Sequence, residues 1–322
     1  MNDQGIGEWT TRWARSEDEP ALLALFERAF GTAISAPHWR WKYRLADTPG
    51  TVCCQGDEVI AFNGGMPRES RVLGEPCRTV QMGDVMVDPA HRGVLTRRGA
   101  FARMVTHYFG ERVGPAHDFR LAFGFPHARA CRVGVRQDLY CEVDRIVEAR
   151  WPALEGRNWR HRLTPVTHAH QSELDGLWQA MAADTARLAI NCRDGQWWCY
   201  RYLDKPANDY RSLLALKRAG GTALGAMTLR VLDDERVELL DLAGPQRAMP
   251  ALVRLARRQT QRLGRRELIA WMTPSALAWC GDTGAERHAT EVVVPGSAIN
   301  APERALEVRD RWWLMGGDSD FR

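Results

Sequence analysis

The sequence predicts a mixed α/β protein that consists of two tandem copies of one α+β domain. The clearest segment is 80–109, where a strand with alternating side chains is followed by a basic, glycine-containing turn and an amphipathic helix. Strand and helix patterns alternate on both sides of this segment. The same order of patterns returns about 150 residues later, which indicates an internal repeat.

The first half of the chain predicts the element order β-α-β-β-β-α-β-α-β. Ser16, acidic residues and Pro20 are typical of a helix start, and Gly31 of a helix end. Gly56-Asp57 between two apolar runs indicates a hairpin. The predicted elements are a strand at 13–15, a helix at 16–30, hairpin strands at 52–54 and 59–63, a strand or turn from 72, a strand at 80–87, a helix at 101–109, a strand at 119–125, a helix at 127–135 and a strand at 141–148.

Alternation along 80–87 places Asp84 on one strand face with three apolar neighbours, which are Val80, Met82 and Met86. Burial raises the pKa of a carboxyl group in such surroundings, and a raised pKa suits a general base. The alternative is that Asp84 makes a structural hydrogen bond. Asp241, at the equivalent position of the second half, favours that alternative.

The turn between this strand and the following helix is a candidate phosphate site. A strand that leads into a helix through such a turn directs free backbone N–H groups and the positive end of the helix dipole at one point. Arg92, Arg97 and Arg98 add positive charge there. The alternative is an ordinary crossover connection with solvated arginines.

The second half repeats features of the first at offsets of 148 to 159 residues. Leu22, Trp39, Asp84 and Pro126 have counterparts at Leu174, Trp198, Asp241 and Pro274. We therefore predict a first domain at 1–150, a polar linker at 151–163 and a second domain at 164–322. In the turn after Asp241, Pro245 removes a backbone donor and no Arg-Gly pair follows. The second copy is therefore expected to have lost cofactor binding.

The segment Val87-Asp-Pro-Ala-His-Arg-Gly93 resembles the start of motif A of the GNAT acyltransferases, which wraps the pyrophosphate of acetyl-CoA. The resemblance implies two tandem GNAT-like acyl-CoA N-acyltransferase domains. Leu95 and Arg97 stand where the family has small residues, so either Gly99-Ala100 serves in a longer loop or the phosphate cradle is damaged. The residues implied in cofactor binding are Met86, Val87, Arg92, Gly93, Val94, Leu95, Thr96, Arg97, Arg98 and Gly99.

The resemblance also implies direct attack of an amine on the thioester, with one group acting as base and another as acid. Asp84 is the candidate base. For the acid, His127-Ala-Arg-Ala130 stands where the family often has Asn-x-x-Ala, and Gly134 stands where its tyrosine follows. This leaves His127, the displaced Tyr140 or solvent as the source of the proton.

Composition limits the remaining possibilities. The chain is 45% hydrophobic and 26% charged, as in globular proteins, and it has no apolar run long enough for a membrane span and no export signal. We therefore expect a cytoplasmic monomer or homodimer. The eight cysteines show no zinc spacing, so no metal site is expected. A net charge of +4, with three lysines and no basic stripe interleaved with aromatic residues, predicts no nucleic-acid partner.

The function expected from the sequence is N-acetyl transfer from acetyl-CoA to an amine of a small molecule, an amino sugar or a protein. Two alternatives belong to other classes. One is a non-catalytic protein that binds acyl-CoA or serves a structural role, and the other is a peptidyl-type transferase that uses aminoacyl-tRNA.

Overall fold

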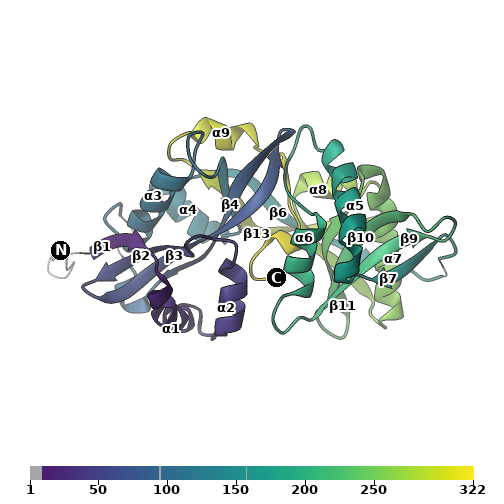
Figure 1. Cartoon of the computed structure of the whole chain (residues 1–322), viewed down its shortest axis with the longest axis horizontal. Helices are drawn as coiled ribbons and strands as arrows, with labels where there is room; N and C mark the ends of the chain where they lie inside the picture. The colour runs from purple at the N-terminus through teal and green to yellow at the C-terminus, as the bar shows by residue number, and fades with distance from the viewer. Residues whose placement is uncertain (1–8, 94–95, 157) are drawn as a thin grey trace. The chain divides into compact units, whose positions relative to one another are not determined.

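The computed structural model describes residues 9–93, 96–156 and 158–322, and it divides the chain into two compact units (Figure 1). Unit 1 comprises the described parts of Met1–Arg68, Cys77–Val143 and Val293–Arg309. Unit 2 comprises Glu69–Pro76, Asp144–Val292 and Asp310–Arg322. Each unit therefore takes segments from both halves of the chain, which a division near residue 150 does not describe.

The prediction that a linker begins at residue 151 is wrong. Trp151 lies in a strand that ends at Pro152, and its side chain is fully buried in the core of unit 2. A second strand begins at His161, within the same segment. An apolar indole in a paired strand belongs to a folded domain and not to a solvated connection.

Unit 1 follows the predicted order of elements, except that it contains α2, a helix that the sequence analysis did not predict, and that several bounds differ by a few residues. Gly31 caps α1 in the left-handed conformation, as its position predicted; at the other end, a 3-10 turn at Ser16–Asp18 leads into α1, which begins at Glu19. The elements are β1 (Trp9–Trp13), α1 (Glu19–Phe30), α2 (Ala36–Tyr43), β2 (Gly50–Gln55), β3 (Glu58–Val72), β4 (Glu75–Val87), α3 (Ala100–Arg112), β5 (Leu121–Gly124), α4 (Ala128–Arg136), the start of β6 (Tyr140–Pro152), the end of β13 (Glu286–Ser297) and α9 (Pro302–Glu307).

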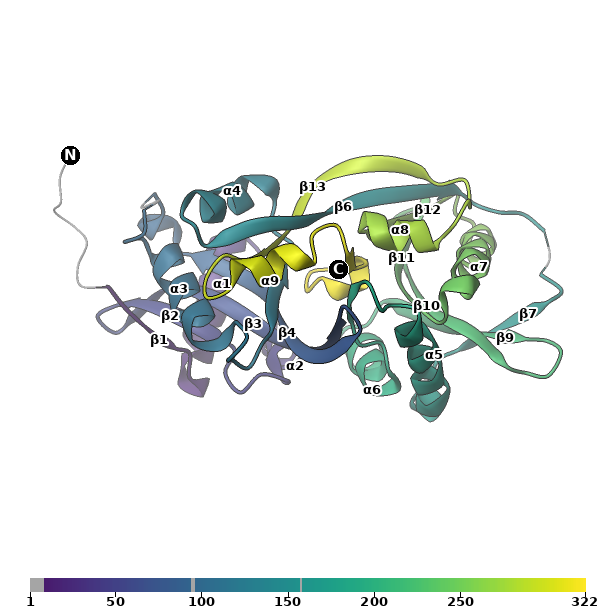
Figure 2. The ribbon, with the colours of Figure 1, turned by 90° about the horizontal axis from the view of Figure 1, so that it is seen from above.

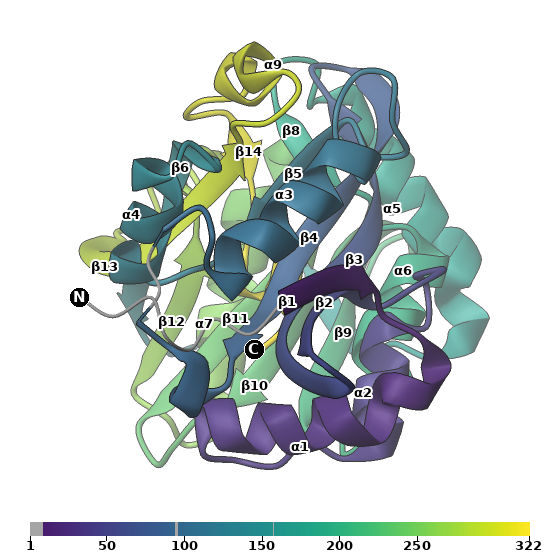
Figure 3. The ribbon, with the colours of Figure 1, turned by 90° about the vertical axis from the view of Figure 1, so that its left-hand side faces the viewer.

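The sheet of unit 1 has the order β1-β2-β3-β4-β5, with antiparallel pairs at β1–β2 and β2–β3 and a parallel pair at β4–β5. Helices α1 and α2 cover one face, where Leu22 and Trp39 pack on Phe62. Helix α3 lies across the other face, where Val105 packs on Val80 (Figure 3). The sheet is therefore covered on both faces, as in other mixed α/β proteins.

Asp84 interrupts the alternation of β4. Its backbone is left-handed, with φ of 47°, so the residues before and after it do not follow one alternating pattern. Val80 and Met82 pack against α3, whereas Met86 packs with α1 and α2. The prediction of one strand face shared by Val80, Met82, Asp84 and Met86 is therefore wrong.

Unit 2 repeats the same arrangement with a seven-stranded sheet of order β13-β6-β12-β11-β10-β9-β7. Its parallel pair, β11–β12, corresponds to β4–β5 of unit 1. Figure 2 shows β13 and β6 running side by side. The further elements are β7 (His161–Pro165), α5 (Gln171–Ala183), β8 (Ala189–Asn191), α6 (Gly195–Trp198), β9 (Tyr210–Lys217), β10 (Ala223–Val231), β11 (Arg236–Ala243), α7 (Met249–Arg262), β12 (Glu267–Met272), α8 (Pro274–Trp279) and β14 (Trp312–Trp313).

The cysteines are free thiols, and most of them are buried. Burial raises the pKa of Cys53 to about 11 and that of Cys131 to about 12. These thiols therefore stay protonated at neutral pH and pack as small apolar side chains. Within the described residues, none of the helices combines the length and the apolar character needed to cross a membrane.

Asp144 is a buried carboxyl group in β6 whose oxygens accept hydrogen bonds from two backbone N–H groups. Oδ1 accepts from Arg145 at 2.8 Å and Oδ2 accepts from Trp312 at 3.3 Å. Desolvation raises the pKa of Asp144 to about 6, although both hydrogen bonds act in the opposite direction. The folded protein therefore binds this proton more tightly than the unfolded chain, and the stability it contributes is lost as the pH rises through about 6.

We expect Asp144→Asn to become more stable relative to the wild type as the pH rises from 4 to 7. The change in the difference between their unfolding free energies is about 2 kcal/mol, because the amide keeps one acceptor and never ionises. Urea unfolding at several pH values measures it. A difference that stays constant over this range would contradict the assignment.

Candidate functional site

The turn that follows β4 is tied to its surroundings by Asp88 at its start. The Asp88 carboxylate accepts a hydrogen bond from the backbone N–H of Ala90 at 2.9 Å and pairs with Arg28 of α1 at 2.7 Å. Desolvation raises the pKa of Asp88, but these two contacts outweigh it and leave the pKa below its usual value. Gly93 has φ of 107°, a conformation that glycine adopts readily. The predicted residues Val94 and Leu95 lie outside the described residues.

The three arginines of the turn differ in what they contact. Arg92 donates from Nε to the carbonyl oxygen of Val87 and from Nη2 to that of Ala29, both at 3.0 Å, so its guanidinium ties the turn to α1. Arg97 pairs with the exposed Asp138 at 2.6 Å. Arg98 is exposed, and among the described residues its guanidinium forms no hydrogen bond or ion pair. Of the three, Arg98 keeps its charge available to a ligand.

The first turn of α3 carries no side-chain cap. Its N-cap residue is Gly99, which has no side-chain acceptor, and the helix continues for 13 residues. The initial N–H groups of such a helix and the positive end of its dipole attract an anion. Together with the neighbouring Arg98, this turn has the chemistry of a phosphate site. Thr96 lies in the same turn, where its hydroxyl accepts from the backbone N–H of Arg98 at 3.3 Å.

The parallel pairing of β4 with β5 ends partway along β4. Its last pair is Met82 with Gly124. At Gly124 a Cβ atom would lie 2.9 Å from the carbonyl oxygen of Met82, so only glycine allows this close approach. The rest of β4, Gly83–Val87, lies beyond the last pair with β5 and leads into the turn.

Asp84 is held by two polar side chains of α2. Lys42 Nζ lies 2.6 Å from its carboxylate, and the hydroxyl of Tyr43 donates to Oδ2 at 2.7 Å. The Lys42 and Asp84 side chains are only 5% and 6% exposed. Asp84 is therefore buried as predicted, but its neighbours are a charged and a hydroxyl group and not the expected apolar side chains.

His127 and Tyr140 lie on other elements. His127 is an exposed residue that caps α4, and its Nδ1 accepts from the backbone N–H of Arg129 at 3.2 Å, so Nε2 carries the proton of the neutral ring. Tyr140 begins β6 and packs against Phe101 and Phe109 of α3. Burial raises the pKa of Tyr140 above its usual value.

Tyr140 also fills the space in front of Gly134. A Cβ atom at position 134 would lie 2.2 Å from the Tyr140 ring. The ring therefore occupies the place that a side chain at 134 would need, and Gly134 is required for its packing.

Unit 2 repeats the buried aspartate but not the open turn. Asp241 accepts from the hydroxyl of Tyr202 at 2.6 Å and pairs with Arg193 at 2.9 Å. In the following turn, the N–H of Gln246 is already bound by the Asp184 carboxylate at 2.8 Å. Pro245 and Pro250 lack N–H groups at the start of α7. This turn therefore has fewer donors for an anion and one adjacent negative charge.

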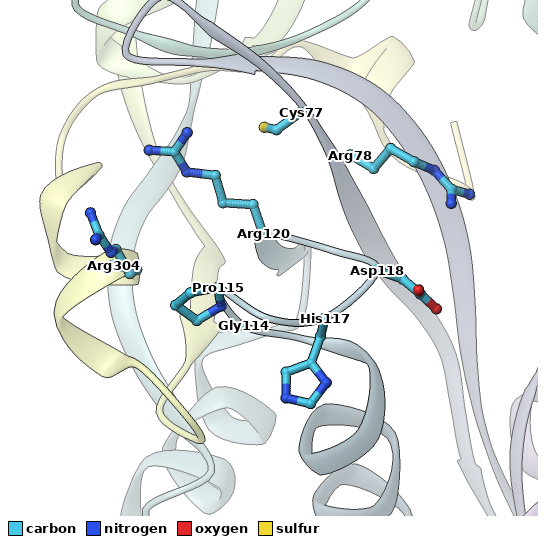
Figure 4. Close-up of a pocket in the computed structure, with 8 residues that line it drawn as sticks. All are labelled: Cys77, Arg78, Gly114, Pro115, His117, Asp118, Arg120 and Arg304. Atoms are coloured by element: carbon cyan, nitrogen blue, oxygen red, sulfur yellow. The ribbon is translucent and has the colours of Figure 1, made fainter.

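A separate pocket of about 430 Å³ lies at the opposite ends of β4 and α3, away from the turn. In Figure 4, Arg120 and Arg304 lie on one side of it and Arg78 and Asp118 on the other. Part of this charge is neutralised, since Arg304 pairs with Glu307 at 3.1 Å. The other lining residues are Cys77, Gly114, Pro115 and His117.

Sequence reasoning missed Lys42 and Tyr43 as partners of Asp84. The signal was present, because the aromatic segments around Tyr43 and Tyr202 precede the two aspartates by similar distances, 41 and 39 residues. Asp84, His127 and Tyr140, the three predicted catalytic residues, lie on β4, at the start of α4 and at the start of β6.

Comparisons with known proteins agree with the fold described above. Residues 10–129 match the model of the acetyltransferase (GNAT) domain. A search of curated protein sequences finds no relative of the chain.

Several solved structures share the fold at low sequence identity. A probable N-acyltransferase from Enterococcus faecalis V583 is 13% identical with a TM-score of 0.67, over 89% of this chain and 72% of its own. A GCN5-related N-acetyltransferase from Anabaena variabilis is 14% identical with a TM-score of 0.67, over 91% and 74%. The N-myristoyltransferase of Saccharomyces cerevisiae with bound myristoyl-CoA is 9% identical with a TM-score of 0.59, over 91% and 80%. Residues 10–129 thus match a GNAT acetyltransferase domain, and the chain shares the fold of these solved structures.

Proposed function

We propose that unit 1 transfers an acetyl group from acetyl-CoA to a primary amine, and that unit 2 binds no cofactor. The observation that carries this proposal is the uncapped first turn of α3, which begins directly after the turn from β4 and has the exposed Arg98 beside it. These groups would hold the pyrophosphate of CoA. The acceptor is an amine of a small molecule, an amino sugar or a protein.

In the proposed reaction, the amine nitrogen attacks the thioester carbonyl carbon. The new C–N bond forms and the C–S bond breaks, so CoA leaves as a thiolate. Asp84 would accept the proton that the amine loses, and His127, Tyr140 or solvent would supply the proton that the thiolate takes. The Lys42 ammonium, 2.6 Å away, holds the Asp84 carboxylate in a fixed position.

Arg98→Ala is expected to weaken the binding of CoA by about ten- to a hundred-fold, because it removes a charge-assisted contact to phosphate. Isothermal titration calorimetry with CoA gives the dissociation constant. Arg97→Ala is the matched control in the same turn, since that guanidinium is paired with Asp138, and it should change the constant far less. Equal effects of the two substitutions would refute the assignment of Arg98.

The same titration tests the asymmetry between the units. We expect one CoA per chain, because two prolines and the Asp184 carboxylate leave the turn of unit 2 unsuited to phosphate. Replacement of Arg247 by alanine in that turn should leave binding unchanged. A stoichiometry of two would show that unit 2 also holds cofactor, and no binding by a folded protein would exclude the proposed activity.

Asp84→Asn is expected to lower kcat by about 10²- to 10⁴-fold, the usual effect of removing a general base. The variant also leaves Lys42 without its buried counter-charge, which should cost about 3–5 kcal/mol of stability. Assays are therefore run below its melting temperature. Asp241→Asn breaks the equivalent contacts in unit 2 and should reduce stability while kcat is kept. If both variants keep the same kcat, Asp84 is structural in unit 1 as Asp241 is in unit 2.

A further inference from the structure

Unit 2 has a groove beside α7, where that helix lies next to the segment leading into β7. Two adjoining hollows of about 270 Å³ and 330 Å³ form it. Figure 1 shows α7 together with β7 and β9 in unit 2. We call this feature the α7 groove; its lining residues come from 158–163, from Leu213 and Arg218 at β9, and from 251–262 of α7.

The α7 groove is lined by basic side chains from both walls. On α7, Arg254, Arg258 and Arg262 follow one another at intervals of four residues, which places them on one helix face over roughly 12 Å. The facing wall contributes its own arginines, which are Arg160, Arg162 and Arg218. Among the described residues that line the two hollows, none is acidic.

This positive charge is not neutralised within the part of the chain that the structure describes. None of the six arginines forms an ion pair there, whereas Arg265 and Arg266, just beyond α7, have the acidic neighbours Asp234 and Glu235. The Nε atom of Arg258 is buried without a hydrogen-bond partner. A buried donor without a partner carries a desolvation cost that a bound anion would relieve.

The pKa values of two neighbouring groups are lowered in part by these positive charges. Desolvation lowers the pKa of His161, and Arg160 and Lys217 lower it further. Desolvation also lowers the pKa of Arg257, with Arg254 and Arg258 adding to the effect. Both shifts have the direction expected beside uncompensated positive charge.

Trp159 adds a flat aromatic surface to the α7 groove. It is 68% exposed, the highest value among the exposed large apolar side chains of the described residues. It lines the same hollow as Arg160 and Arg254. An exposed indole next to arginines is the combination with which proteins bind unpaired bases and their phosphates.

We propose that the α7 groove binds single-stranded nucleic acid, with successive phosphates on the arginines of α7 and an unpaired base stacked on Trp159. A single small anion would occupy only part of a row of three arginines, whereas a strand can follow it. A bilayer surface is flat and fits a concave groove poorly. This proposal is independent of acyl transfer, and it departs from the expectation of no nucleic-acid partner.

The test measures fluorescence anisotropy of a labelled 15-residue oligouridylate and of the matching oligodeoxythymidylate with the full chain. We expect binding that weakens as salt rises, and at least a ten-fold loss of affinity for Arg254→Glu and for Arg262→Glu. Trp159→Ala should lose roughly five- to a hundred-fold with little change in the salt dependence, because it removes stacking and not charge. A preference for the RNA strand would identify the 2′-hydroxyl as a contact, and equal binding would identify the phosphates and bases alone.

Arg287→Glu is the matched control. Arg287 is an exposed arginine of β13, also in unit 2, and its reversal changes the net charge by the same amount. Its affinity should stay within about two-fold of the wild type. Equal losses for Arg287→Glu and Arg254→Glu would overturn the proposal, and so would binding to phosphatidylserine vesicles without binding to either oligonucleotide. All three reversed arginines are exposed, so circular dichroism should show unchanged folding.

Discussion

Each unit depends on one buried aspartate that joins its central strand to a helical segment. Asp84 binds Lys42 and Tyr43 in unit 1, and Asp241 binds Arg193 and Tyr202 in unit 2. A charge removed from water must be paired and hydrogen-bonded, so each carboxylate restricts where its partners can lie. In unit 1 the left-handed backbone of Asp84 also changes which side chains of β4 face α3. These contacts and the backbone of Asp84 therefore determine the direction and the packing of β4 where it enters the turn before α3.

The turn after β4 shows how residues of one type come to serve different purposes. Arg92 donates hydrogen bonds to two backbone carbonyl groups, and Arg97 pairs with an exposed carboxylate. Arg98 has neither contact and stands beside the uncapped start of α3. Anchoring by Arg92 and Asp88 holds this turn to α1. Because Asp88 and Arg92 are already anchored, they lose little further conformational entropy when a ligand binds beside them.

The sequence predicted most of the order of elements in unit 1, because hydrophobic period and glycine positions are local signals, but it missed α2. It assigned Asp84 to the wrong face because a single positive φ, which no pattern announces, reverses the alternation after it. The domain boundary was predicted near residue 150, whereas β6 and β13 each contribute residues to both units. The alternation of side chains along a strand does not show to which unit that strand belongs. The basic groove was missed because its arginines come from separate segments that only the fold brings together.

The interleaving of the two units bears on how the chain acquires its structure during synthesis. Unit 1 needs Val293–Arg309, where Asn300 donates from its side-chain amide to the carbonyl oxygens of Phe109 and Val113. These residues leave the ribosome only after Asp144–Val292 of unit 2 has been made. The N-terminal unit must therefore wait, incomplete, while unit 2 is translated. A nascent chain of this kind exposes unfinished apolar surface for longer than two domains arranged one after the other, and its dependence on chaperones should be correspondingly greater.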